Sequence, residues 1–182
     1  MRELDLDRPE PEVFLNQRTL IRGEVNRGKT TLLGRIMRAF WDQGYRDLGL
    51  IDLAPPLTRG VGGKMELGEM SPAFYYPVST VAPRLSGGDE AEVEALARRN
   101  QMVIAEAFQQ YLKAPGQVLF VNDVSLYLHQ GRAEELISWL KNLSTVVMNG
   151  YYGQSLGGGE LGQRERRGME ELARWCHRVI EL

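Results

Sequence analysis

The stretch Gly23-Glu24-Val25-Asn26-Arg27-Gly28-Lys29-Thr30 follows the pattern G-x-x-x-x-G-K-[ST] and stands between a short apolar strand and an amphipathic helix. The strand is predicted over 18–22, and the helix over 29–42, with Leu33, Ile36, Met37 and Phe40 on one face. Glycines at positions 23 and 28 let the backbone turn tightly enough for successive N–H groups to point inward at an anion. The N-terminus of the helix adds a partial positive charge. The stretch therefore predicts a phosphate-binding loop.

The side chains of this loop have separate predicted roles. Lys29 is expected to reach the β- and γ-phosphates of a nucleotide, and the Thr30 hydroxyl is expected to bind Mg²⁺. The remaining nucleotide contacts are predicted from the rest of the loop and the first helical turn, namely Gly23, Glu24, Val25, Asn26, Arg27, Gly28 and Thr31. The predicted cofactors are thus a nucleotide, ATP, and Mg²⁺. The alternative is an ordinary turn between a strand and a helix.

A second acidic anchor for the metal is predicted at the end of Val118-Leu119-Phe120-Val121-Asn122-Asp123. This run of apolar, strand-forming residues closes on a carboxylate. Mg²⁺ on a triphosphate keeps several waters and needs about one or two carboxylates. Thr30 and Asp123 are therefore the predicted metal residues. The alternative for Asp123 is a turn or helix cap.

Together the two motifs resemble those of the P-loop nucleoside-triphosphatase superfamily. The resemblance is specific at 23–30 and 118–123, and in pattern it covers nearly the whole chain. It implies an α/β fold in three layers with a mainly parallel sheet. In layout alone, the C-terminal half looks like RecA-like ATPases and corrinoid adenosyltransferases. No N-K-x-D guanine motif occurs, so the resemblance favours ATP over GTP.

Two other subfamilies of that superfamily fit the residues less well. The run Leu85-Ser86-Gly87-Gly88-Asp89 looks like the L-S-G-G-Q signature of ATP-binding-cassette proteins but departs from it at the last position. A glycine turn with Asp89 as the N-cap of the next helix explains the run more simply. The MinD-type loop has a lysine directly after its first glycine, where this chain has Glu24.

Strand and helix signals alternate along the chain. Strands are predicted at 18–22, 47–53, 77–82, 117–122, 144–149 and 178–182, and helices at 29–42, 89–113, 131–142 and 164–176. This order is typical of a mainly parallel sheet covered on both faces. No internal repeat or linker divides the chain, so a single domain over 1–182 is predicted.

Ligands of such sheets bind at the carboxyl ends of the strands, which draws attention to Asp52 and Arg84. Asp52 is a candidate for orienting the attacking water or a substrate hydroxyl, and a turn cap is the alternative. Arg84 is a candidate for holding the γ-phosphate or an acceptor, and a surface ion pair with Asp89 or Glu90 is the alternative. Lys29, Asp52, Arg84 and Asp123 thus form the predicted catalytic set.

Composition restricts the partners. The chain has 182 residues, 43% of them hydrophobic, a net charge of −2 and one cysteine. The lack of a basic excess makes nucleic-acid binding unlikely, and no run is apolar enough to span a membrane. A single cysteine permits no internal disulfide, which fits the reducing cytoplasm.

Two classes of function follow. The first is a slow ATPase that acts as a nucleotide-dependent switch, with loops at 54–76 and 150–163 that bind a protein partner, or with a homodimer completing the site. The alternative is an ATP-dependent small-molecule transferase of the kinase or adenosyltransferase type. Slow hydrolysis is expected because Val124, and not glutamate, follows Asp123.

Overall fold

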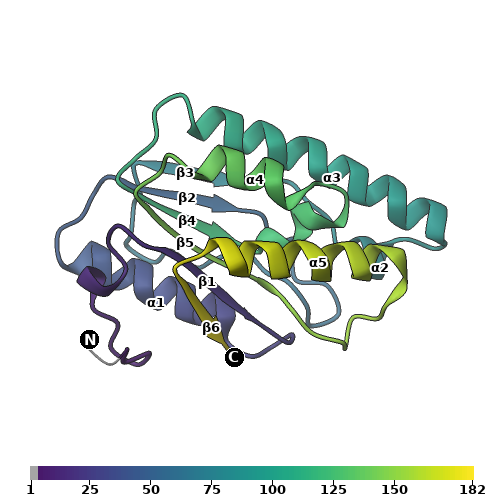
Figure 1. The fold of residues 1–182 in the computed structure, drawn as a ribbon, viewed down its shortest axis with the longest axis horizontal. Helices are drawn as coiled ribbons and strands as arrows, with labels where there is room; N and C mark the ends of the chain where they lie inside the picture. Colours follow the sequence, from purple (N-terminus) through teal and green to yellow (C-terminus); the bar gives the residue numbers. More distant parts are fainter. Residues whose placement is uncertain (1–3) are drawn as a thin grey trace.

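The computed structural model describes residues 4–182 as an α/β fold built on one six-stranded sheet (Figure 1). The strands are β1 (Arg18–Gly23), β2 (Leu48–Asp52), β3 (Phe74–Pro77), β4 (Val118–Asn122), β5 (Thr145–Tyr151) and β6 (Arg178–Glu181). Their order is β3-β2-β4-β5-β1-β6, and every pair is parallel. The predicted parallel α/β class is confirmed.

Helices cover both faces of the sheet, which gives three layers (Figure 1). On one face lie α1 (Lys29–Asp42) and the short turn η1 (Pro11–Val13). The other face carries α3 (Glu90–Tyr111), α4 (Ala133–Leu140) and α5 (Gly159–Trp175), together with the 3-10 turn η2 (Val124–His129). The four-residue helix α2 (Pro83–Ser86) precedes α3. The part of the chain that the structure describes has no helix long and apolar enough to cross a membrane.

Strand β4 contributes side chains to the hydrophobic core on each face of the sheet. Successive side chains of a strand point to opposite faces. Val118 and Phe120 accordingly pack with α1, whereas Leu119 and Val121 pack with α3, α4 and α5. Burial on both faces explains why the strand is a continuous apolar run.

Two predicted boundaries are wrong. The strand expected at 77–82 lies at 74–77, because residues after Pro77 turn back over the end of β2: Val78 N donates to Asp52 O at 2.9 Å. Helix α5 begins at Gly159 and not at 164, since Leu161 adds a buried apolar position to its inner face. The prediction that Asp89 caps the long helix is confirmed, with its side chain accepting from Glu92 N at 2.8 Å.

Candidate functional site

The predicted phosphate-binding loop, residues 23–30, leaves β1 and opens α1 as expected from the sequence. Gly28 adopts a φ of +83°, a left-handed conformation that glycine enters at little cost. Gly23 meets a second constraint, since a Cβ there would lie 2.0 Å from the carbonyl oxygen of Leu182. Glycine is thus required at both ends of the loop for different reasons.

Lys29 and Thr30 extend from the first turn of α1 to the carboxyl ends of the neighbouring strands. The Lys29 ammonium donates to the backbone oxygen of Glu24, which folds the side chain back along its own loop. Burial lowers the pKa of Lys29, while the carboxylates of Asp123 and Glu24 act in the opposite direction. The two carboxylates thus offset part of the cost of burying the Lys29 ammonium.

The Thr30 hydroxyl donates a hydrogen bond to Asn122, the last residue of β4. Thr30 Oγ1 lies 3.2 Å from Asn122 Oδ1 and 3.4 Å from Asn149 Nδ2 at the end of β5. Neither asparagine was among the predicted site residues, because a carboxylate was expected beside Thr30. Asn122 is the last residue of β4 and Asp123 lies in the left-handed turn that follows, so the two side chains have different partners.

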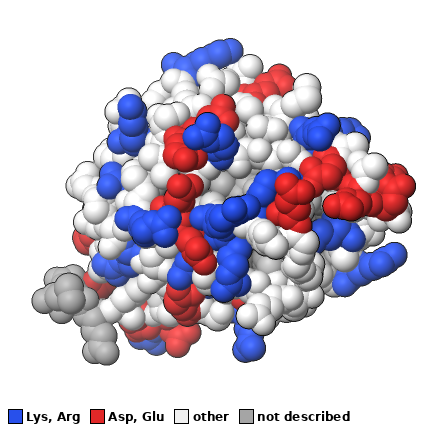
Figure 2. Space-filling model, turned by 45° about the vertical axis from the view of Figure 1, so that its right-hand side comes forward, with Lys and Arg blue, Asp and Glu red and all other residues white. Residues whose placement is uncertain are grey.

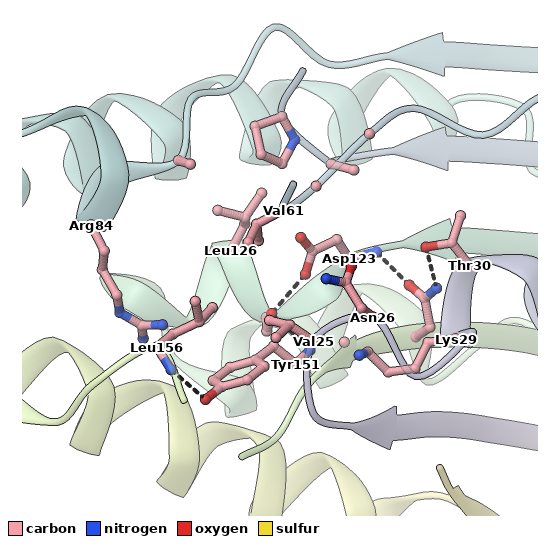
Figure 3. A pocket seen from close by; sticks show the side chains of 18 of the residues that line it. Val25, Asn26, Lys29, Thr30, Val61, Arg84, Asp123, Leu126, Tyr151 and Leu156 are labelled. Carbon is pink, nitrogen blue, oxygen red and sulfur yellow. Dashed lines mark hydrogen bonds between the residues drawn. The ribbon is translucent and has the colours of Figure 1, made fainter. Parts of the chain in front are cut away.

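Asp123 begins the turn after β4 and lines a cavity beside the loop (Figure 3). Its backbone is left-handed, with a φ of +62°, and its N–H donates to Asn149 Oδ1 at 2.6 Å. One carboxylate oxygen accepts from Ser125 Oγ at 2.7 Å. Burial raises the pKa of the Asp123 carboxyl, whereas the Ser125 hydroxyl and the nearby positive charges lower it. The hydrogen bond from Ser125 therefore fixes the Asp123 carboxyl group at the wall of the cavity.

Asp52 does not line the cavity, which corrects its predicted role as the group that orients an attacking water. Its side chain is fully buried. Oδ1 accepts from Asn122 Nδ2 at 2.8 Å, and Oδ2 accepts from Met65 N at 2.7 Å. A carboxylate whose two oxygens are engaged in the interior serves to fix Asn122, which in turn accepts from Thr30.

Arg84 belongs to the cavity wall but not to the surface ion pair considered as its alternative. It extends from α2 and pairs with Glu165 of α5, whose second oxygen lies 2.8 Å from His129 Nε2. Burial alone would raise the pKa of the Glu165 carboxyl, but its hydrogen bond to His129 and the charges of His129 and Arg84 lower it. Neither Glu165 nor His129 belonged to the predicted set, because sequence separation hides this contact.

The cavity measures about 410 Å³ and runs along the carboxyl edge of the sheet. Lys29, Thr30, Arg84 and Asp123 all line it, together with Val25, Asn26, Arg27, Gly28 and Thr31 from the predicted nucleotide contacts. Gly23, Glu24 and Asp52 do not. In Figure 3, Lys29 and Thr30 lie at one end and Arg84 at the other. The structure thus brings together three of the four predicted catalytic residues.

Two oxygen atoms of the cavity wall suit a hard cation such as Mg²⁺, namely the Thr30 hydroxyl and the Asp123 carboxylate, while the buried Asn122 amide oxygen accepts from the Thr30 hydroxyl. No cluster of three or more His, Cys, Asp or Glu residues within 4–182 could hold a metal by itself.

Comparison with known proteins identifies no family for this chain. No protein-family model matches the chain, and no curated protein does. One solved structure with similarity to the chain is the Pif1 helicase from Candida albicans, with a TM-score of 0.43 and 17% sequence identity over the whole of this chain and 40% of the helicase. The chain thus spans less than half of that helicase.

Proposed function

We propose that this protein binds Mg·ATP at the phosphate-binding loop and hydrolyses it slowly. The observation that carries the proposal is the joint position of Lys29, Thr30 and Asp123 around one cavity at the carboxyl edge of a parallel sheet. Inward backbone N–H groups, a helix N-terminus and a lysine are the features that bind a triphosphate. A carboxylate fixed beside them by a hydrogen bond, here that of Asp123, can accept a proton from an attacking water.

The polar groups around Thr30 support a division of roles in that chemistry. Thr30 would lie nearest to the metal, Asn122 would accept from its hydroxyl, and Asp52 would keep the Asn122 amide in its orientation. Asp123 has one carboxylate oxygen bonded to Ser125 and borders the cavity, so it is our candidate for the general base. This assignment replaces the sequence-based prediction that Asp52 is the base and Asp123 the metal anchor.

Calorimetry tests the nucleotide site directly. Wild-type protein and Lys29→Ala would be titrated with ATP in Mg²⁺ and again in excess EDTA. We expect binding that needs Mg²⁺ and weakens at least tenfold in Lys29→Ala, while the exposed control Lys141→Ala binds as the wild type does. Equal affinity in Lys29→Ala and Lys141→Ala would overturn the assignment.

The length of the cavity favours a second candidate, in which the terminal phosphoryl or another part of ATP passes to a small molecule. Residues of α2 and η2 wall the cavity beyond the loop, and water alone needs no such space. Release of ADP and of pyrophosphate or triphosphate, with and without a panel of metabolites, separates the two candidates, because transfer of the adenosyl or adenylyl part of ATP leaves no ADP. A metabolite that multiplies the rate identifies a transferase, whereas a constant basal rate identifies an ATPase.

The surface is compatible with either candidate. Figure 2 shows Lys and Arg interleaved with Asp and Glu over the face in view, without a field of one sign. A nucleotide-dependent switch that binds a protein partner or a second copy would make the basal rate depend on protein concentration or on that partner. The same ATPase assay over a hundredfold range of protein concentration tests the homodimer.

A further inference from the structure

The far end of the cavity is separate from the phosphate-binding loop. Its walls come from Ala82 to Leu85 around α2, from Leu126 and His129 of η2, and from Leu156 and Glu165 around the start of α5. Leu126, Tyr151 and Leu156 lie between Arg84 and Lys29 (Figure 3). A ligand part held at Arg84 would therefore reach Lys29 only across an apolar middle section.

Arg84 is fixed at this end by an ion pair. Its side chain is 14% exposed and that of Glu165 is 5% exposed. Burying charges costs free energy unless they are paired and hydrogen-bonded, and the shared contact of Glu165 with Arg84 and His129 meets that need. The guanidinium thus keeps one position without a ligand.

Two polar atoms of the same wall stay unused. Arg84 Nε and His129 Nδ1 are buried and have no hydrogen-bond partner among the residues the structure describes. An unpaired buried polar atom costs about 1–3 kcal/mol, so native proteins rarely keep one without a reason. Glu165 engages one terminal nitrogen of a guanidinium that carries five N–H groups, which leaves donors for a second anion.

The cavity wall beside Arg84 is largely apolar. Pro83, Leu85, Leu126 and Leu156 line it, and the guanidinium carbon of Arg84 lies 5.8 Å from the centre of the Tyr151 ring. Pockets that combine apolar walls with a few fixed polar groups are typical of small organic ligands.

We propose that this end of the cavity binds a small organic anion, in which an aliphatic or aromatic body packs against Leu126, Leu156 and Tyr151 and a carboxylate or similar group accepts from Arg84. If the proposed transferase function holds, such a molecule is the acceptor, since its opposite end would face Asp123 and the terminal phosphate. Binding of the anion itself does not depend on that function.

Two fluorescent probes with nearly the same body test the proposal. One is 8-anilinonaphthalene-1-sulfonate, which carries a single sulfonate, and the other is N-phenyl-1-naphthylamine, which lacks it. Both are titrated into wild-type protein and Arg84→Met, which keeps the length of the side chain and removes its charge. The exposed Arg167→Met on α5 serves as the matched control.

We expect the sulfonate probe to bind at least tenfold more weakly to Arg84→Met than to wild type or Arg167→Met. The neutral probe should bind all three proteins within about twofold. An unchanged sulfonate affinity in Arg84→Met, or an equal loss for both probes in a folded protein, would overturn the proposal. If Arg84→Met fails to fold because Glu165 loses its ion-pair partner, Arg84→Met/Glu165→Gln removes both charges and carries the same expectation.

ATP titrations on the same variants separate this proposal from the nucleotide site. Lys29→Ala should lose ATP affinity while changing sulfonate-probe affinity less than Arg84→Met does. A large loss of ATP affinity in Arg84→Met with sulfonate binding intact would assign Arg84 to the phosphates and refute the anion site. A failure of the nucleotide site appears only in Lys29→Ala.

Discussion

Glu24 of the predicted phosphate-binding loop and Ser155 of the loop after β5 are joined by hydrogen bonds that cross 131 positions of sequence. The Glu24 carboxylate accepts from the N–H groups of Gln154 and Ser155 and from the Ser155 hydroxyl. The Ser155 hydroxyl and the Gln154 N–H are the main reasons why the pKa of Glu24 falls to about 2. A carboxylate with so low a pKa stays ionised at any pH at which the protein would work.

Removal of the Glu24 carboxylate should loosen the loop at 153–157. In Glu24→Ala we expect faster amide hydrogen exchange at Gln154, Ser155 and Leu156, because two of these N–H groups lose their acceptor. Mass-spectrometric exchange at pH 7 measures the change. Exchange as slow as in wild type would mean that the loop is held by other contacts, such as that of Leu156 N with the Tyr151 hydroxyl at 3.0 Å.

The same contact places a negative charge in a loop that is proposed to bind phosphates. Glu24→Gln keeps an acceptor oxygen and removes the charge, so ATP should bind about two- to fivefold more tightly at low salt, with a smaller gain at high salt. Calorimetry at two salt concentrations checks this, with Glu66→Gln as the exposed control. Weaker ATP binding in Glu24→Gln would indicate that the carboxylate is needed to shape the loop.

Asn122→Asp tests the buried chain from Asp52 to Thr30. The change puts a second carboxylate within 2.8 Å of Asp52, where like charges repel in the interior, and we expect a loss of about 3–5 kcal/mol at pH 7. Repulsion raises the pKa of the pair above the unfolded value. The penalty is therefore absent at low pH and grows as pH rises through the raised pKa.

Urea melts at several pH values measure that penalty. The exchanged pair Asp52→Asn/Asn122→Asp carries one carboxylate and one amide, and it should recover part of the lost stability. If the difference in unfolding free energy between Asn122→Asp and wild type is the same at every pH, the two side chains do not interact.

Local patterns predicted the loop and α1 because the interactions that decide them lie within a few residues. The bounds of α1, residues 29–42, agree with the prediction, and Gly28 has the left-handed φ that its place in the motif requires. The strand at 74–77 was displaced in the prediction, since its pairing depends on β2 and on the turn back after Pro77. Such contacts leave no periodic signal in the chain.

The site was harder to predict for the same reason. That Asp123 and not Asn122 faces the cavity depends on a left-handed turn with a φ of +62°, which no motif specifies for an aspartate. The partner of Arg84 is Glu165, 81 positions away, although Asp89 and Glu90 are much nearer in sequence. Residue types suggested which chemistry to look for, and tertiary contacts decided which residue carries it.

The core between α3 and the sheet should dominate stability. Phe108 is fully buried and its ring centre lies 5.3 Å from that of Trp139 on α4, so Phe108→Ala should cost about 3–5 kcal/mol. Met102 on the same helix is 73% exposed, and Met102→Ala should cost less than about 0.5 kcal/mol. Denaturant melts measure both. A loss below about 1 kcal/mol for Phe108→Ala would mean that α3 contributes little to the folded core.

The role of Asp123 can be decided by a single isosteric change. A general base must be ionised to accept a proton, and burial raises the pKa of the Asp123 carboxyl. Turnover by the wild type should therefore fall as pH is lowered through that raised pKa, at a higher pH than an ordinary aspartate would give. Asp123→Asn should bind Mg·ATP nearly as well as wild type, lose about 10²–10⁴-fold in single-turnover hydrolysis, and lose the acid limb of the pH profile.

If Asp123 instead holds the metal, Asp123→Asn will need far more Mg²⁺ to bind ATP and will recover its rate once Mg²⁺ saturates. That second result would restore the sequence-based assignment of Asp123 as the metal anchor and refute its role as the base.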